Sequence, residues 1–143
     1  MPTDITTSAS IEIHAPGTQV WKALTSPELI EQWFFGVRTE TDWREGGPIV
    51  HRGELNGRPY EDRGTILRVE PESLLVHTHW SSVSGLPDAP ENYQEVEWAL
   101  REHDDDATEL VVSETNIPSE DAKSMSERAW EAALRSLKDL LET

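Results

Sequence analysis

The sequence predicts an α+β fold in which an antiparallel sheet of six to seven strands packs against one long C-terminal helix. Segments of alternating polar and apolar residues fill the middle of the chain and are separated by turn signals, as in antiparallel strands joined by hairpins. The last quarter changes to helical spacing, and two short helical segments follow the first alternating segment.

The first strand is expected over residues 8–14, where Ile11 and Ile13 share one face. The sequence Ala15-Pro16-Gly17 ends it, and helical spacing then begins at Thr18. Ser26 precedes Pro27 and is a suitable N-cap for a second short helix, since serine accepts hydrogen bonds from free helical N–H groups. Two short helices are therefore expected directly after the first strand.

The remaining strands alternate in hydrophobicity between turns. The Asn56-Gly57 pair is the sharpest hairpin signal, because both residues tolerate the positive φ angles of a two-residue turn. A polar segment rich in glycine and proline covers residues 81–92 and predicts a loop. Strands are expected at residues 38–43, 49–54, 58–69, 74–80, 93–103 and 108–115.

Residues 119–143 predict the long helix. Ser119 after Pro118 is a suitable N-cap, and Glu120 and Asp121 favour the positive end of the helix dipole. The apolar face is expected to contain Ala122, Met125, Ala129, Trp130, Ala133, Leu134, Leu137, Leu140 and Leu141. Four residues along the inner face are small, namely Ala122, Ser126, Ala129 and Ala133, whereas Leu134, Leu137, Leu140 and Leu141 toward the end of the helix are large. This gradient indicates either a cavity beneath the first half or a close approach of helix and sheet, since protein interiors are normally close-packed.

Length and charge limit the classes of function. A chain of 143 residues fits a single domain, 1–143, with a core of its own. It contains no cysteine, which excludes disulfides and thiolate chemistry, and no signal peptide or membrane span is evident. The net charge of −16 repels phosphate backbones and anionic lipids, so neither nucleic acid nor membrane is an expected partner. A cytoplasmic protein is expected. The acidic surface suits either a high-salt cytoplasm or an arginine-rich proteome.

Several local sequences, in this order, carry a family resemblance. They are Ile13-His14-Ala15-Pro16, residues 20–25 and 27–34, Gly46-Gly47, Gly57, Tyr60, Gly64, Pro71, and Trp130 with Leu134 and Leu137. Together they resemble the START-like (SRPBCC) helix-grip superfamily, and within it the branch similar to the C-terminal domain of the activator of the Hsp90 ATPase (AHSA-like proteins). The resemblance implies a sheet that curves around the long helix and leaves a pocket between them. It says little of function, because members bind varied apolar ligands and a few are enzymes.

The same resemblance suggests a strand register and therefore which side chains point inward. They are Ile49, His51, Tyr60, Asp62, Ile66, Leu75, His77, His79, Val96, Trp98, Leu100, Leu110, Val112 and Glu114. Three of the five histidines then face the helix. A slip by one residue would instead expose both His77 and His79 to solvent. This alternative register stays open, because the opposite face of their strand is the more apolar one. An inward Glu114 needs a histidine partner or a raised pKa.

The expected function is binding of a small apolar or amphipathic molecule in a cavity between sheet and helix. The candidate ligand-binding residues are Trp33, Phe34, His51, Tyr60, His77, His79, Trp98, Glu114, Ser126, Ala129, Trp130 and Ala133. No cofactor and no metal site is expected, because no recognised motif supports a histidine-bound metal. Two alternatives remain: a cyclase or hydrolase that uses a pocket histidine and carboxylate, and a chaperone-interaction module. Residues 33–35 are candidates for the pocket mouth or for a homodimer contact.

Overall fold

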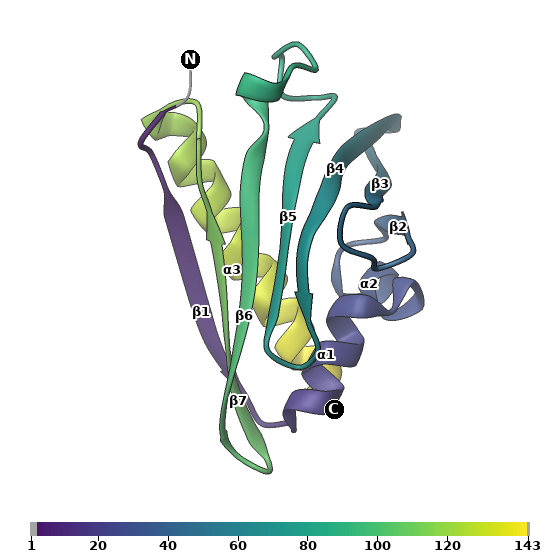
Figure 1. Cartoon of the computed structure of the whole chain (residues 1–143), viewed down its shortest axis with the longest axis vertical. Helices are drawn as coiled ribbons and strands as arrows, with labels where there is room; N and C mark the ends of the chain where they lie inside the picture. Colours follow the sequence, from purple (N-terminus) through teal and green to yellow (C-terminus); the bar gives the residue numbers. More distant parts are fainter. Residues whose placement is uncertain (1–2, 143) are drawn as a thin grey trace.

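Seven strands form one antiparallel sheet in the order β1-β7-β6-β5-β4-β3-β2 (Figure 1). The structure is a computed structural model that describes residues 3–142. Its elements are β1 (Thr7–Ile13), α1 (Gly17–Thr25), α2 (Pro27–Trp33), β2 (Arg38–Thr41), β3 (Pro48–Leu55), β4 (Arg58–Glu70), β5 (Leu74–Ser81), η1 (Pro90–Asn92), β6 (Gln94–Asp104), β7 (Ala107–Glu114) and α3 (Glu120–Glu142). The predicted α+β fold, with two short helices after the first strand and one long final helix, is confirmed.

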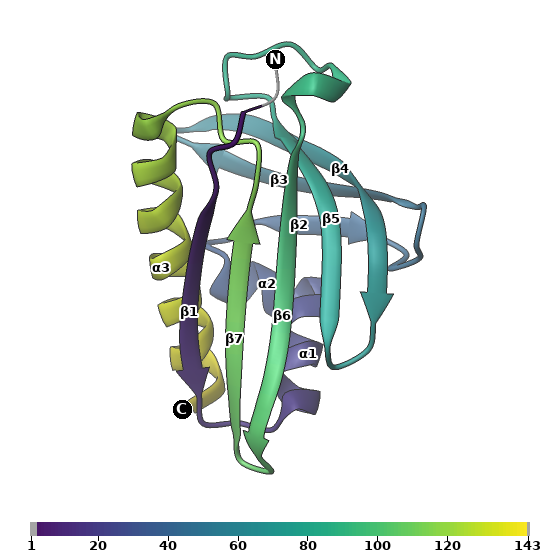
Figure 2. The ribbon, with the colours of Figure 1, turned by 60° about the vertical axis from the view of Figure 1, so that its left-hand side comes forward.

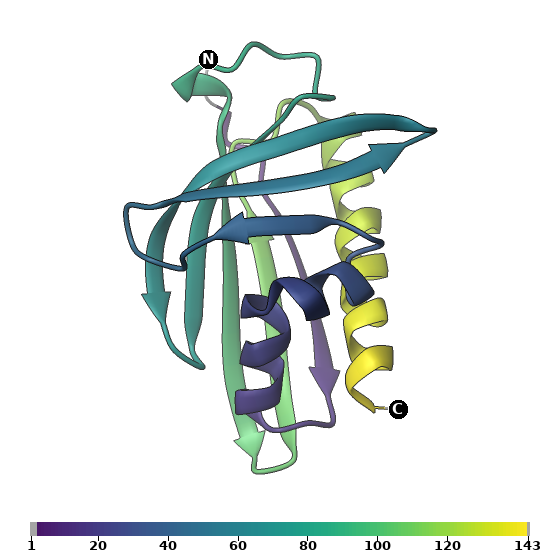
Figure 3. The ribbon, with the colours of Figure 1, turned by 90° about the vertical axis from the view of Figure 1, so that its right-hand side faces the viewer.

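The sheet curves strongly from one edge to the other. At one edge β1 runs beside α3 (Figure 2), whereas β2, β3 and β4 turn away and cross in front of α3 above the two short helices (Figure 3). A bulge between Ile66 and Arg68 interrupts the pairing of β4 with β5. In the same strand Gly64 lies so close to β5 that a Cβ there would overlap the carbonyl oxygen of Thr78. Bulges and glycines of this kind bend a strand and allow a sheet to wrap around its core.

The long helix begins with a side-chain cap, in which Ser119 Oγ accepts a hydrogen bond from the backbone N–H of Ala122 at 3.1 Å. Its buried residues, Ala133, Leu134 and Leu137, all lie in the second half, so this half packs on the core as the size gradient predicts. The predicted end at Thr143 lies outside the described residues. No helix in residues 3–142 is long and apolar enough to cross a membrane.

The predicted inner face of α3 is wrong at two positions. The side chain of Met125 is 70% exposed, and Ala129 is exposed as well. Trp130, which was predicted on the same face, does point inward and packs against the apolar core. The buried face is therefore narrower than predicted, because a large indole ring gains far more from burial than a methyl group does and the helix turns Trp130 rather than Ala129 toward the core.

The short helices bring the aromatic residues of the N-terminal part against the sheet. The amphipathic α1 buries Val20, Ala23 and Leu24, while α2 buries Ile30 and Trp33. The prediction that the Ser26 side chain caps α2 is wrong: Ser26 occupies the N-cap position, but its side chain makes no capping hydrogen bond. Its backbone carbonyl accepts the N–H of Ile30 at 2.9 Å, which is the first hydrogen bond of the helix.

Two other local features follow from the sequence. The Asn56-Gly57 hairpin between β3 and β4 has φ values of 54° and 79°, as the predicted tight turn requires. At the free edge of the sheet, two α3 side chains bind the backbone of the first strand. Lys138 Nζ donates to the carbonyl of Glu12 at 2.7 Å, and Glu142 Oε2 accepts the N–H of His14 at 2.8 Å.

Candidate functional site

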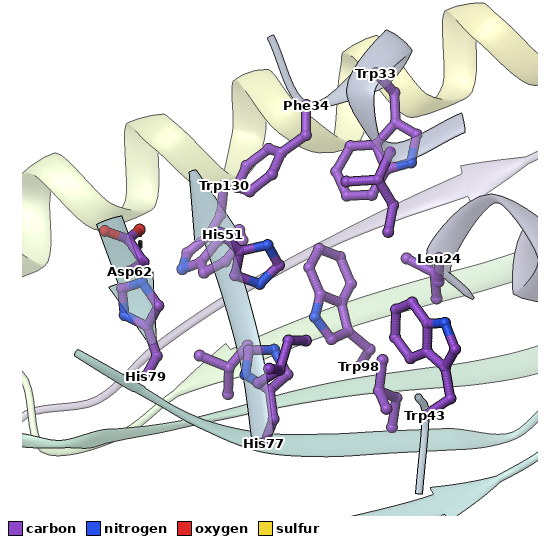
Figure 4. A pocket seen from close by; sticks show the side chains of 14 residues that line it. Leu24, Trp33, Phe34, Trp43, His51, Asp62, His77, His79, Trp98 and Trp130 are labelled. Atoms are coloured by element: carbon purple, nitrogen blue, oxygen red, sulfur yellow. Dashed lines mark hydrogen bonds and ion pairs between the residues drawn. The ribbon is translucent and has the colours of Figure 1, made fainter. Parts of the chain in front are cut away.

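A cavity of about 50 Å³ lies inside the curve of the sheet, closed by the short helices and by one residue of α3 (Figure 4). It is lined by Leu24, Ile30, Trp33, Phe34, Trp43, Ile49, His51, Asp62, Leu75, His77, His79, Val96, Trp98 and Trp130. One water molecule needs roughly 10–15 Å³, and an engineered cavity that admits benzene measures about 150 Å³. The cavity therefore accepts very small molecules as it stands and has to widen for an aromatic ring.

Aromatic rings make up much of the cavity wall. Trp98 lies edge-to-face against Trp33, with ring centroids 5.9 Å apart, and against Trp130, at 5.4 Å. The Trp33 indole N–H donates to the Ala23 carbonyl at 2.8 Å, which fixes the ring between α1 and the sheet. Phe34 stacks on Trp130 with a centroid distance of 6.4 Å and an interplanar angle of 6°. This stack connects the end of α2 with α3.

The polar groups gather at one end of the cavity. In Figure 4, Asp62, His79, His51 and His77 lie on one side, and Leu24 and Trp43 lie on the other. Strand pairing explains this grouping, since His51 of β3 stands directly opposite Asp62 of β4. His77 and His79 lie two residues apart on β5 and share the inner face, as the suggested register requires.

His79 and Asp62 form the one ion pair among the residues of the cavity wall. His79 Nε2 lies 3.0 Å from Asp62 Oδ2, and its Nδ1 lies 3.4 Å from Gln94 Oε1. Burial alone would lower the pKa of His79, but the hydrogen bond and charge of Asp62, with smaller contributions from Glu114 and Gln94, raise it above its ordinary value. Both ring nitrogens face acceptors, so the protonated imidazolium satisfies this geometry best.

The other two histidines are neutral. Burial lowers the pKa of His77 to about 4, a backbone hydrogen bond opposes this shift in part, and the charge of His79 adds to it. Burial, together with the neighbouring His77 and His79, lowers the pKa of His51 to about 3. His77 Nδ1 lies 2.9 Å from the carbonyl oxygen of Thr78, which can only accept, so Nδ1 carries the hydrogen. In the neutral ring Nε2 is then an acceptor.

Glu114 is buried in β7 just outside the cavity wall. Only 4% of its surface is exposed, and its Oε1 accepts a hydrogen bond from the indole N–H of Trp130 at 3.3 Å. A buried carboxylate needs such partners, because an unpaired charge is costly to bury. The bond also holds the Trp130 ring in its inward position against the sheet.

The structure brings together seven of the twelve candidate residues from the sequence: Trp33, Phe34, His51, His77, His79, Trp98 and Trp130 line the cavity. The other five do not. Tyr60 shares the inner face of β4 but packs over Gly53 of the neighbouring strand, where its hydroxyl would lie 2.7 Å from an added Cβ. Ala133 is fully buried in the core, and Ala129 is exposed. Ser126 is half-buried and, like Glu114, lies outside the wall.

The small helix residues are absent from the wall because Ala129 is exposed and Ala133 is buried in the core, and the α3 side chain that reaches the cavity is the large Trp130. The sequence candidates also omitted Asp62, although the register placed it on the inner face. The signal for Asp62 was its position opposite His51 across the predicted hairpin. The described residues contain no group of histidine and carboxylate side chains arranged to hold a metal ion.

A curved antiparallel sheet around a long C-terminal helix, with a cavity on its inner side, defines the helix-grip class of proteins. Residues 14–142 match the family described as "Activator of Hsp90 ATPase homolog 1-like protein". The chain belongs to this family, as the resemblance in its sequence indicates. None of the curated proteins matches the chain.

Solved structures agree with this assignment. A protein from Cytophaga hutchinsonii, known from its solution structure, is 37% identical over 99% of this chain and 97% of its own, with a TM-score of 0.83. CalU16 from Micromonospora echinospora is 31% identical over 95% of this chain and 75% of its own, with a TM-score of 0.73. A protein from Chromobacterium violaceum is only 21% identical, over 96% and 97% of the two chains, and its TM-score of 0.81 shows the shared fold alone.

Proposed function

We propose that this protein binds a small, mostly apolar or amphipathic molecule in the cavity inside the curved sheet. The observation that supports this function best is the composition of the wall, in which aromatic rings surround the space and a few polar groups gather at one end. Sites for small molecules in proteins have this character: apolar walls supply most of the affinity, and a few placed polar groups orient the ligand.

Access to the cavity is expected through the stack of Phe34 on Trp130. Phe34 lies in the turn that follows α2, and the next two residues, Phe35 and Gly36, have φ values of 56° and 81°. A positive φ is unusual for an aromatic residue, and the Phe35 side chain is 66% exposed. Movement of this turn would separate Phe34 from Trp130, so a ligand larger than a few water molecules could reach the cavity without unfolding the sheet.

Proton-transfer catalysis in the same cavity is the second candidate, and the His79–Asp62 pair is the observation that favours it. A histidine held by a carboxylate can donate and accept a proton near neutral pH. The described cavity wall contains no serine or lysine that could serve as a nucleophile. The His79–Asp62 pair therefore suits a reaction that proceeds by general acid–base catalysis.

Mass spectrometry of small molecules released from the purified protein tests binding directly. We expect a stoichiometric compound of low polarity from the wild-type chain. The Val96→Phe variant, in which a ring extends into the cavity, should release none, while Val112→Phe should release the same compound, because Val112 lies in the core outside the cavity wall. The proposal would be wrong if all three proteins release the same compounds in the same amounts. A compound chemically altered during incubation would instead support the catalytic candidate.

A further inference from the structure

One oxygen of the Asp62 carboxylate has no partner. Its Oδ2 accepts the hydrogen bond from His79 at 3.0 Å, whereas Oδ1 is buried and has no hydrogen-bond partner among the described residues. Buried polar atoms are nearly always paired, because leaving one unpaired costs on the order of 1–3 kcal/mol. Asp62 lines the cavity, so a group bound there is well placed to satisfy this oxygen.

A donor stands beside this acceptor. His51 faces Asp62 directly across the β3–β4 pairing, and both side chains line the cavity. His51 Nδ1 lies 2.9 Å from Thr39 Oγ1. When the Thr39 hydroxyl donates to Nδ1, the neutral ring carries its hydrogen on Nε2 and can donate it to a bound molecule. The polar end of the cavity then offers one acceptor and one donor on neighbouring strands.

We propose that the ligand bears a neutral hydroxyl group that donates a hydrogen bond to Asp62 Oδ1 and accepts one from His51 Nε2. This inference rests on the proposed binding function and names the polar group of the ligand. A hydroxyl is both a donor and an acceptor, as this pair of residues requires. A carboxylate can only accept and would face the charge of Asp62, and an ammonium can only donate.

The surroundings also discriminate against a charged ligand. Burial, with smaller contributions from neighbouring histidines, keeps the pKa values of His51 and His77 far below their ordinary range and outweighs the opposing attraction of Asp62 for His51, so both rings stay neutral. An ammonium group in the same place would meet the same two penalties. A carboxylate would meet Asp62 at the cavity wall and Glu114 just behind it. A neutral group avoids both penalties.

The rest of the ligand is an apolar body of modest size, which lies toward Trp98, Trp33 and Leu24 at the far end of the cavity. Oδ1 is covered by neighbouring atoms, so the hydroxyl reaches it as the cavity widens around the incoming ring. Phenol is a suitable small probe of this arrangement. Benzene lacks the hydroxyl, and benzoate replaces it with a charged acceptor.

Titrations of the purified protein with phenol, benzene and benzoate, followed by NMR of the tryptophan indole N–H groups, test the proposal. We expect phenol to bind roughly tenfold more tightly than benzene, the factor given by one hydrogen bond to a charged acceptor, and benzoate not to bind. Asp62→Asn should reduce the preference for phenol over benzene to about twofold or less, because the amide presents N–H where Oδ1 lies. The surface variant His103→Gln is the matched control and should keep the wild-type ratio.

Thr39→Val provides a second test in case Asp62→Asn fails to fold. It removes the hydroxyl that sets the hydrogen of His51 on Nε2, so it should lower the affinity for phenol and leave that for benzene unchanged. If benzene binds as tightly as phenol, or benzoate binds more tightly, the hydroxyl proposal is wrong and the binding function stands. If none of the three probes binds and the purified protein releases no compound, both proposals are wrong.

Discussion

Filling the cavity with one larger side chain should cost little stability, whereas the same change elsewhere in the core should cost more. Val96 on β6 is 1% exposed and lines the cavity. Val112 on the neighbouring β7 is fully buried but lies outside the wall. Replacing each valine with phenylalanine adds the same atoms to the same kind of strand. The two variants therefore differ mainly in whether free volume is present beside the side chain.

The magnitude follows from two opposing contributions. Phenylalanine adds four carbon atoms to valine, and at about 0.8 kcal/mol per buried CH₂ their complete burial would stabilise the fold by roughly 3 kcal/mol. Overpacking of a dense core typically costs about 1–3 kcal/mol. Part of the new ring at Val96 can occupy the 50 Å³ cavity, so the two contributions should nearly cancel there. At Val112 the neighbours have to move, and a net loss of roughly 1–3 kcal/mol is expected.

Urea unfolding followed by tryptophan fluorescence, with circular dichroism as a second probe, measures both free energies of unfolding. We expect Val96→Phe to lie within about 1 kcal/mol of wild type and Val112→Phe to lie clearly below it, with similar m-values for all three proteins. Equal losses for the two variants would refute the reasoning, because they would mean that the space beside Val96 is as densely packed as the rest of the core.

Three further predictions concern stability. The pKa of His77 falls from 6.5 to about 4 on folding, so the unfolded chain binds more protons and stability should decrease by on the order of 3 kcal/mol as the pH falls through this range. His77→Phe should flatten that acid limb in urea titrations, and an unchanged limb would contradict the assignment. Gly64→Ala should lower the free energy of unfolding by roughly 3 kcal/mol or more, since the new Cβ would overlap the Thr78 carbonyl. Gly17→Ala should lower it far less, because its Cβ meets only the movable Glu102 side chain. Equal melting temperatures for the two variants would disprove this difference. The net charge of −16 should make the chain more stable in salt, because raising the salt concentration from 0.1 to 1 M shortens the screening length from about 10 to 3 Å and weakens charge repulsion. We therefore expect a higher melting temperature at 1 M salt. A flat or falling melting temperature would count against charge repulsion.

The fold could be predicted because each element carries a periodic signal of its own. Strand alternation and the Asn56-Gly57 turn placed the hairpin of β3 and β4, and the spacing of the last quarter placed α3. The width of the buried face of that helix was harder to predict, because Met125 and Ala129 are apolar and yet exposed. Contact with the sheet decides which apolar residues are buried, and that contact is a tertiary property.

The sequence predicted which side chains lie on the inner face of the sheet, but not which of them reach the cavity. The register suggested by the family resemblance placed His51, His77 and His79 on the inner side of the sheet, where the structure has them. It also placed Tyr60 there, but the position of a residue along a curved strand decides whether it reaches the cavity or covers a neighbouring strand. The pairing of Asp62 with His79 depends on the bulge at Ile66 and on the bend of β4, and no local pattern records either.

The hydrogen bonds from α3 to the first strand have a consequence for solubility. β1 is an edge strand, and the unpaired backbone groups of such a strand can serve as a template for pairing with another chain. Lys138 and Glu142 already occupy the carbonyl of Glu12 and the N–H of His14, and they place two charges beside this edge. An incoming strand would have to displace a salt-bridged pair from a well-packed helix. The C-terminal helix therefore blocks intermolecular β-pairing at this edge. Deleting the last turn of the helix should promote aggregation under conditions in which the sheet is still folded.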